Sequence, residues 1–370
     1  MAVHVSLAPK VNYASMHNAV PVLRELWVEN ISPQPLEALA VQLRSEPPVL
    51  VSKRWFIDRL GPGERLYIDD RDVVVDAGFL WELTEALTTR VEVVVTSNGQ
   101  KLAVASTPIE VLARNEWGGV DSMPELIAAF VTPNDPGVER VLKTASILLR
   151  DRGLSPALDG YQSGSPRRAA EIAAAIWAAV GQLGLDYSAP PASFERQGQK
   201  VRTPSHIVEA GLGTCLDLTL FFAACLEQAG LNPLIVFLRG HALVGCWLQE
   251  EHFAGVVVDD PAALRNRIRL GELLIFETTL ATQRPLPAFS AAVDAGEKLI
   301  APENDARFEC VIDVRCARMQ RIRPLPSQRP DAKDADGVRP EREDSDADRA
   351  SRAVDIPEIP IKPPVRELDV

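Results

Sequence analysis

The sequence has no apolar run long enough to cross a membrane, since such a helix needs about 20 consecutive apolar residues. Its longest candidate, residues 216–229, is interrupted by Asp217, Glu227 and Gln228. The first ten residues, MAVHVSLAPK, also lack a basic start followed by an apolar stretch, so we expect no secretory signal peptide. These absences predict a protein without membrane partners, and its few, unpaired cysteines fit a reducing, cytoplasmic setting.

Positive charge and cysteine are also scarce. The 370 residues carry 39 lysines and arginines against 51 aspartates and glutamates, a net charge of −12. Surfaces that bind nucleic acid are normally basic, so direct binding of nucleic acid is not expected. The five cysteines are odd in number and contain no Cys-x-x-Cys pair. The sequence therefore predicts neither a disulfide framework nor a zinc site, and no metal or cofactor.

The first part of the chain is rich in β-branched and aromatic residues. Six or more short segments of this kind, separated by turn residues, fill residues 1–115. They predict an all-β domain, specifically an immunoglobulin-like sandwich. We expect this sandwich to brace its neighbour or to recognise a protein partner.

A second domain of α+β class is predicted over residues 116–325. Apolar residues recur at helical spacing after Ser165-Pro166, which is a good helix start, and Gly184 is a plausible stop. Strand candidates follow at 233–238, 242–249, 273–278 and 308–315. Residues 326–370 are charged and contain prolines, which is typical of a disordered tail or linker that could carry a docking peptide.

Only one cysteine lies at a predicted helix start. Gly211 and Gly213 permit a sharp turn, and Thr214 with Asp217 forms a T-x-x-D capping pattern. Cys215 then falls in the first helical turn, where the helix dipole and free backbone N–H groups favour a thiolate. The same N–H groups could hold a developing oxyanion. We therefore predict that Cys215 is a nucleophile.

Element lengths indicate where the partners of this cysteine lie. A helix from 214 to about 229 and a returning strand over 231–238 have similar lengths, at about 1.5 and 3.3 Å per residue. His241 should therefore return to the cysteine end. A later strand over 273–278, paired antiparallel with the histidine strand, would place Glu277 beside His241. The expected set is Cys215 as nucleophile, His241 as base and Glu277 as the acid that orients it.

Three segments resemble motifs of the transglutaminase-like cysteine peptidase superfamily. GLGTCLDLTLFFAACLEQAGLNP is similar to its cysteine motif, GHALVGCWL to its histidine strand, and FETT to its third motif, usually Asp-x-Thr. These three motifs are especially similar to those of transglutaminase-like domains in large bacterial proteins that also carry helicase or nuclease modules, some linked to phage defence. The resemblance implies a papain-like thiol fold over roughly residues 165–280 and a protein, peptide or amide substrate.

Several departures keep alternatives open. Glu277 stands where the family has aspartate, Leu243 stands where an aromatic residue is common, and 36 residues separate His241 from Glu277. Asp259 and Asp260 are therefore rival acids. His206, nine residues before the cysteine, is a rival base that could line the cleft.

The remaining prominent residues are expected to be structural. Cysteines in apolar segments usually behave as buried small hydrophobes, which we expect of Cys225, Cys246, Cys310 and Cys316. Trp177 and Trp247 are expected in the core, and Arg167-Arg168 on a solvated helix face. Two classes of function remain. The first is an enzyme, which is either a cysteine peptidase or an acyl transferase that uses the same triad. The second is a non-catalytic module that binds a partner.

Overall fold

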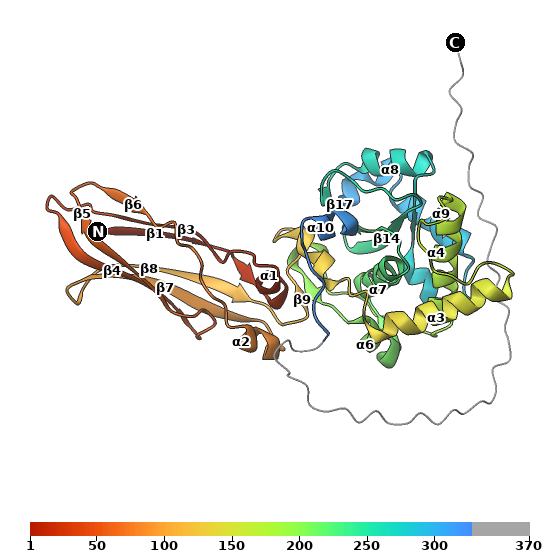
Figure 1. Cartoon of the computed structure of the whole chain (residues 1–370), viewed down its shortest axis with the longest axis horizontal. Helices are drawn as coiled ribbons and strands as arrows, with labels where there is room; N and C mark the ends of the chain where they lie inside the picture. Colours follow the sequence, from red (N-terminus) through yellow and green to blue (C-terminus); the bar gives the residue numbers. More distant parts are fainter. Residues whose placement is uncertain (328–370) are drawn as a thin grey trace, which may run out of the picture. The chain divides into compact units, whose positions relative to one another are not determined.

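The computed structural model describes residues 1–327, so the tail predicted at 326–370 lies almost wholly outside the described residues. Its contacts divide the chain into two compact units (Figure 1). Among the described residues, the first unit contains Met1–Leu126 and Arg196–Lys200, and the second contains Ile127–Glu195 and residues 201–327. Together they form a mixed α+β protein, in agreement with the predicted class.

The first unit is built mainly from strands. One sheet has the order β1 (Ala2–Leu7), β3 (Leu23–Glu29), β6 (Arg65–Tyr67), and the other has the order β2 (Lys10–Val11), β8 (Gln100–Val111), β7 (Leu87–Ser97), β4 (Leu36–Glu46), β5 (Lys53–Leu60). The unit also contains helices α1 (Tyr13–His17) and α2 (Ala77–Glu82). A short antiparallel pair is formed by β9 (Glu116–Trp117) and β11 (Gln199–Lys200). Val91, Val93 and Val95 of β7 are buried and the residues between them are only partly buried, as a strand with one face on a core requires. The predicted N-terminal β unit is therefore present.

The second unit centres on a five-stranded antiparallel sheet. Its order is β15 (Val257–Val258), β17 (Phe308–Asp313), β13 (Pro233–Leu238), β14 (His241–Trp247), β16 (Leu273–Phe276). The longer helices are α3 (Pro136–Asp151), α4 (Pro166–Gly181), α6 (Pro204–Ala210), α7 (Cys215–Gln228), α8 (Pro261–Arg269) and α9 (Phe289–Leu299). Shorter elements of this unit are the 3-10 turns η2 (Thr278–Thr282) and η3 (Pro302–Arg307), helix α10 (Val314–Met319), and the pair β10 (Asp186–Tyr187) with β12 (Leu212–Gly213). The 3-10 turn η1 (Pro124–Phe130) and helix α5 (Phe194–Gln197) include residues of both units.

Helix α7 is the central helix of this unit. It packs against β13 and β14 and also contacts α3 and α4 (Figure 1). An aromatic cluster links α4, α7, β16 and α9 through Trp177, Phe222, Phe276 and Phe289. Another apolar cluster includes Trp247 of β14 and Leu264 of α8. Trp177 and Trp247 are 2% and 0% exposed, which confirms their predicted core positions.

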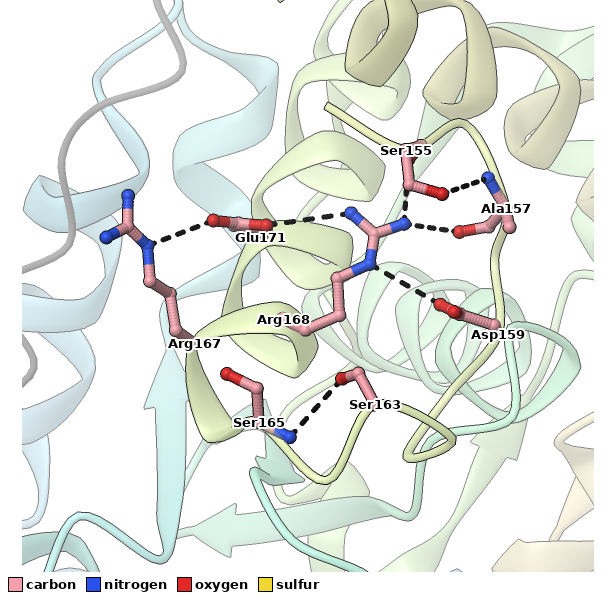
Figure 2. Close-up of polar contacts among 8 residues, drawn as sticks. All are labelled: Ser155, Ala157, Asp159, Ser163, Ser165, Arg167, Arg168 and Glu171. Atoms are coloured by element: carbon pink, nitrogen blue, oxygen red, sulfur yellow. Dashed lines mark hydrogen bonds and ion pairs between the residues drawn. The ribbon is translucent and has the colours of Figure 1, made fainter. Parts of the chain in front are cut away.

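The start of α4 corrects one prediction. Arg167 is exposed, as expected, but Arg168 is buried, and its guanidinium is the centre of a polar cluster (Figure 2). It donates to the carbonyl oxygens of Ser155 and Ala157 and forms ion pairs with Asp159 and Glu171. The expectation of a solvated arginine was wrong because the preceding loop folds back over the helix start and covers it.

Within residues 1–327, no helix combines the length and the apolar character that a membrane span requires.

Candidate active site

The cysteine lies at a helix start that several polar groups fix in place. Thr214 and Asp217 form the predicted capping box: the Thr214 backbone N–H donates to the Asp217 carboxylate at 2.9 Å, and the Asp217 backbone N–H donates to the Thr214 hydroxyl at 3.2 Å. The Asp217 carboxylate also accepts from the backbone and the guanidinium of Arg202, at 2.8 and 2.7 Å. Since Asp217 is fully buried, this pairing holds the first turn of α7 and Cys215 in a defined orientation.

The histidine returns to this end of α7 through a tight hairpin. Strand β13 runs antiparallel to β14, and Leu238 lies opposite His241. Arg239 and Gly240 connect them, with Gly240 in the left-handed region at φ 72°, which a residue without a β-carbon adopts readily. The expected return of the chain is therefore observed, and His241 is the first residue of its strand.

Glu277 is the acid that contacts this histidine. The His241 Nε2 and Glu277 Oε2 atoms are 2.5 Å apart. The other carboxylate oxygen, Oε1, accepts from the backbone and the hydroxyl of Thr279 at 2.9 and 2.7 Å. These contacts fix the carboxylate and engage Nε2, so Nδ1 is the ring nitrogen that remains for the thiol.

The pKa values of the pair reflect these contacts. Burial alone would lower the pKa of His241, but hydrogen bonds to Cys215 and Glu277 and the negative charges of those groups raise it to about 9. Burial would likewise raise the pKa of Glu277, but His241 and Thr279 hold it below its ordinary value. Near neutral pH these shifts favour a His241 imidazolium beside the Glu277 carboxylate.

The thiol itself is closed to solvent in this conformation. Cys215 is 0% exposed, whereas the His241 side chain is 17% exposed. All five cysteines are unpaired and buried, which confirms the core positions predicted for the other four. What distinguishes Cys215 is its contact with His241 rather than its degree of burial.

The rival residues lie elsewhere. His206 is exposed on α6, and Asp259 is exposed after β15, at the opposite edge of the sheet from β16. Asp260 caps α8 by accepting from the Ala262 backbone at 2.8 Å. The structure therefore brings Cys215, His241 and Glu277 together, and it gives Asp260 a helix-capping contact instead. Within residues 1–327, no group of three or more His, Cys, Asp or Glu side chains is suited to hold a metal ion.

One residue at this site was not anticipated. Tyr187 in β10 pairs with Gly213, two residues before the cysteine, and its hydroxyl interacts with the Cys215 thiol. Burial and the charge of Cys215, together with this hydrogen bond, raise the pKa of Tyr187 to about 12. The only sequence signal was the unusual length of the loop in which it lies, residues 186–204.

Comparisons with known proteins leave the family open. No family model matches the sequence, and no curated protein matches it. Among solved structures, the Escherichia coli chaperone DraB is similar over a region that covers 30% of this chain and 55% of the DraB chain, with 17% sequence identity and a TM-score of 0.19. A protein of Parabacteroides distasonis ATCC 8503, provisionally named a protease, is similar over 75% of this chain and 65% of its own, with 11% identity and a TM-score of 0.24. Both scores are too low to establish a shared fold.

Proposed function

We propose that this protein is a thiol hydrolase, and specifically a cysteine peptidase that acts through an acyl-enzyme on Cys215. The observation that supports the proposal is the position of His241, whose imidazole contacts both the Cys215 thiol and the Glu277 carboxylate. A buried nucleophile–base–acid chain of this kind is the arrangement that thiol catalysis needs.

In the reacting form the thiol proton of Cys215 has already passed to Nδ1 of His241, which leaves a thiolate beside an imidazolium. The Cys215 sulfur attacks a peptide carbonyl carbon, and the electron pair of the C=O bond moves to oxygen. The backbone N–H of Cys215, in the first turn of α7, is the donor placed for that oxyanion. As the C–N bond breaks, His241 protonates the leaving amine. Water, deprotonated by His241, then hydrolyses the thioester and restores the thiol.

Glu277 supports both proton transfers. Its carboxylate holds the imidazole with Nε2 protonated and stabilises the positive charge that His241 carries between the two steps. The contacts of Oε1 with Thr279 keep the carboxylate from rotating away. We therefore assign Glu277 the role that aspartate has in the family motif.

The surrounding architecture is compatible with the transglutaminase-like, papain-like fold that the sequence motifs resemble. A cysteine at the start of a buried helix packs on an antiparallel sheet that carries the histidine, and the acid follows the next strand. We include that fold in the proposal, with the immunoglobulin-like description of the N-terminal β unit.

Labelling with iodoacetamide at pH 7, followed by mass spectrometry of each cysteine peptide, tests the proposal. Cys215 is expected to label faster than the other four cysteines, and His241→Ala is expected to slow it about 100-fold, within the range by which general bases contribute. The matched control is His206→Ala, which removes an exposed histidine and should leave the rate unchanged. Equal rates at all five cysteines would contradict an activated nucleophile.

Two other outcomes would redirect the proposal. If labelling is fast but peptides are joined to amines rather than hydrolysed, the same acyl-enzyme serves an acyl transferase. If the protein binds a partner and Cys215→Ala changes nothing, the unit is a non-catalytic binding module. The complete burial of Cys215 is the observation that favours this second alternative.

A further inference from the structure

A pair of buried threonines joins the helix that carries the nucleophile to the turn that follows the acid. Thr219 lies on α7 one turn after Cys215, so their side chains share one face of the helix. Thr278 begins η2 and directly follows Glu277. The two threonine hydroxyls are 3.4 Å apart, within hydrogen-bonding distance, and both residues are 0% exposed. The two elements therefore meet at a polar contact inside the core.

The surroundings of this contact are apolar. Residues 220–226 of α7 are all buried and apolar, and so is Phe276, which precedes the acid. Within residues 1–327, the hydroxyl of each threonine forms its hydrogen bond with the other threonine and with no further group. A buried hydroxyl that loses its partner destabilises a protein, because it has already given up its hydrogen bonds to water. Each of the two hydroxyls therefore depends on the other.

The contact also closes a ring of interactions around the site. The Cys215 thiol contacts the His241 imidazole, whose Nε2 lies 2.5 Å from the Glu277 carboxylate. Thr278 follows that glutamate, and its hydroxyl returns to Thr219 on the same helix as the cysteine. Two methyl groups in place of the hydroxyls would keep their carbons about 4 Å apart, so the hydroxyl pair brings α7 and η2 closer by roughly 0.5 Å. Catalytic groups have to be held within about 0.5 Å of their productive positions.

We propose that Thr219 and Thr278 are positioning residues for the nucleophile. Their hydroxyl pair holds the first turns of α7 at the distance from η2 at which His241 reaches both Cys215 and Glu277. This inference rests on the proposed thiol chemistry and adds the residues that set its geometry. Neither threonine takes part in a chemical step; both act through the elements that carry the nucleophile and the acid.

The test compares Thr219→Val, Thr278→Val and the double variant in the full chain. Each single variant leaves one buried hydroxyl without its partner, so its urea midpoint should fall below that of the wild type. The double variant removes both hydroxyls and keeps the shape of the side chains, so its midpoint should return most of the way to the wild-type value. The reaction of Cys215 with iodoacetamide at pH 7 should instead be about tenfold slower in all three variants, because a misplacement of about 1 Å can cost about 100-fold.

A conservative variant and a matched control separate position from stability. Thr219→Ser keeps the hydroxyl and should retain the wild-type labelling rate. Thr89→Val removes a fully buried hydroxyl from β7, where it donates to the Pro47 carbonyl at 2.8 Å, and should leave the reaction of Cys215 unchanged. Cys225, which is buried on α7, stays unlabelled only if the helix is still packed, so its labelling reports unfolding.

The double variant is the decisive comparison. If it regains both its stability and the wild-type labelling rate, the threonine pair is only structural and the positioning role is refuted. A double variant as unstable as the single variants would show that the hydroxyls do not serve each other, which also refutes that role. If His241→Ala labels as fast as the wild type, the proposed function fails and the positioning role fails with it. Slow labelling in His241→Ala together with normal labelling in the threonine variants refutes the positioning role alone.

Discussion

Replacing Glu277 with glutamine should uncouple His241 from its charge partner. The two side chains are 2.5 Å apart and largely buried. Two unit charges about 4 Å apart attract by about 4 kcal/mol at an effective dielectric constant of ~20. Because glutamine retains some hydrogen bonding and water can relax around it, we expect about half of this, ~2 kcal/mol, to be lost. That corresponds to a decrease of about 30-fold in the reactivity of Cys215 at pH 7.

The geometry of the amide adds to this effect. The contacts of Thr279 with Oε1 favour an amide whose oxygen stays at that position, so its NH₂ group would face Nε2 of His241. An NH₂ donor there requires an unprotonated Nε2, which places the neutral-ring proton on Nδ1. The nitrogen that should receive the thiol proton would then already carry one. The reaction rate of Cys215 and the pKa of His241 should therefore both fall in Glu277→Gln.

An NMR titration measures the pKa directly. The chain has five histidines, and the assignment of His241 follows from the loss of its signal in His241→Ala. In Glu277→Gln its pKa should move from about 9 toward the ordinary value of 6.5. The control is Glu272→Gln, which removes a carboxylate that pairs with Arg267 at 2.6 Å instead. A His241 pKa that stays near 9 in Glu277→Gln would refute the reasoning.

Stability should follow the same titration. A histidine with a raised pKa contributes stability that is fully present below its unfolded value of 6.5 and is lost as the pH rises through about 9. The lowered pKa of Glu277 contributes stability above 4.5, which is lost as the pH falls through the folded value. The gap in unfolding free energy between wild type and Glu277→Gln should therefore be widest between about pH 4.5 and 6.5. Urea titrations at several pH values measure it.

Two further predictions concern the loop before α4. Arg168→Met should lower the free energy of unfolding by about 3 kcal/mol, because it removes the hydrogen bonds of a buried guanidinium to two loop carbonyls and its ion pair with Asp159, whereas Arg167→Met at an exposed site should change it by less than about 0.5 kcal/mol. Gly160→Ala should cost about 3 kcal/mol, since its β-carbon would lie 2.4 Å from the Gly230 carbonyl oxygen at a φ of 56°. Gly164→Ala, at a φ of 64° with nothing within 4 Å, should cost only about 1 kcal/mol. Urea unfolding checks both pairs, and equal effects within a pair would contradict the packing argument.

The parts of the site that depend on local sequence could be predicted. The capping box at Thr214 and Asp217 is encoded within four residues, and the return of the chain to His241 follows from the similar lengths of a helix and a strand. The contact of Glu277 with His241 follows from antiparallel pairing of two adjacent strands. In each case, neighbouring residues or one pairing rule determine the geometry.

Other features depend on contacts that the sequence does not mark. Tyr187 reaches the thiol through a two-residue parallel pair, too short to leave a periodic pattern. Asp259 and Asp260 were alternative candidates to Glu277 because the segment after β14 also carries carboxylates. Only the order of the strands, with β15 and β16 at opposite edges of the sheet, shows which acid lies near His241. Arg168 appeared solvated because its burial depends on how residues 155–159 fold over it.

The hydroxyl of Tyr161 joins the two strands of the β13–β14 hairpin at the end away from His241. It accepts from the Asn232 backbone at 2.8 Å and donates to the Trp247 carbonyl at 2.9 Å, which joins the approach to β13 to the last residue of β14. Helix α7, about 21 Å long, and the hairpin behind it are thus braced at the end opposite the cysteine and the histidine. Loss of the Tyr161 hydroxyl is therefore expected to loosen this end of the hairpin and, with it, the relative positions of Cys215 and His241. The alignment of the candidate site thus depends on a hydrogen-bonding residue at the other end of its supporting elements.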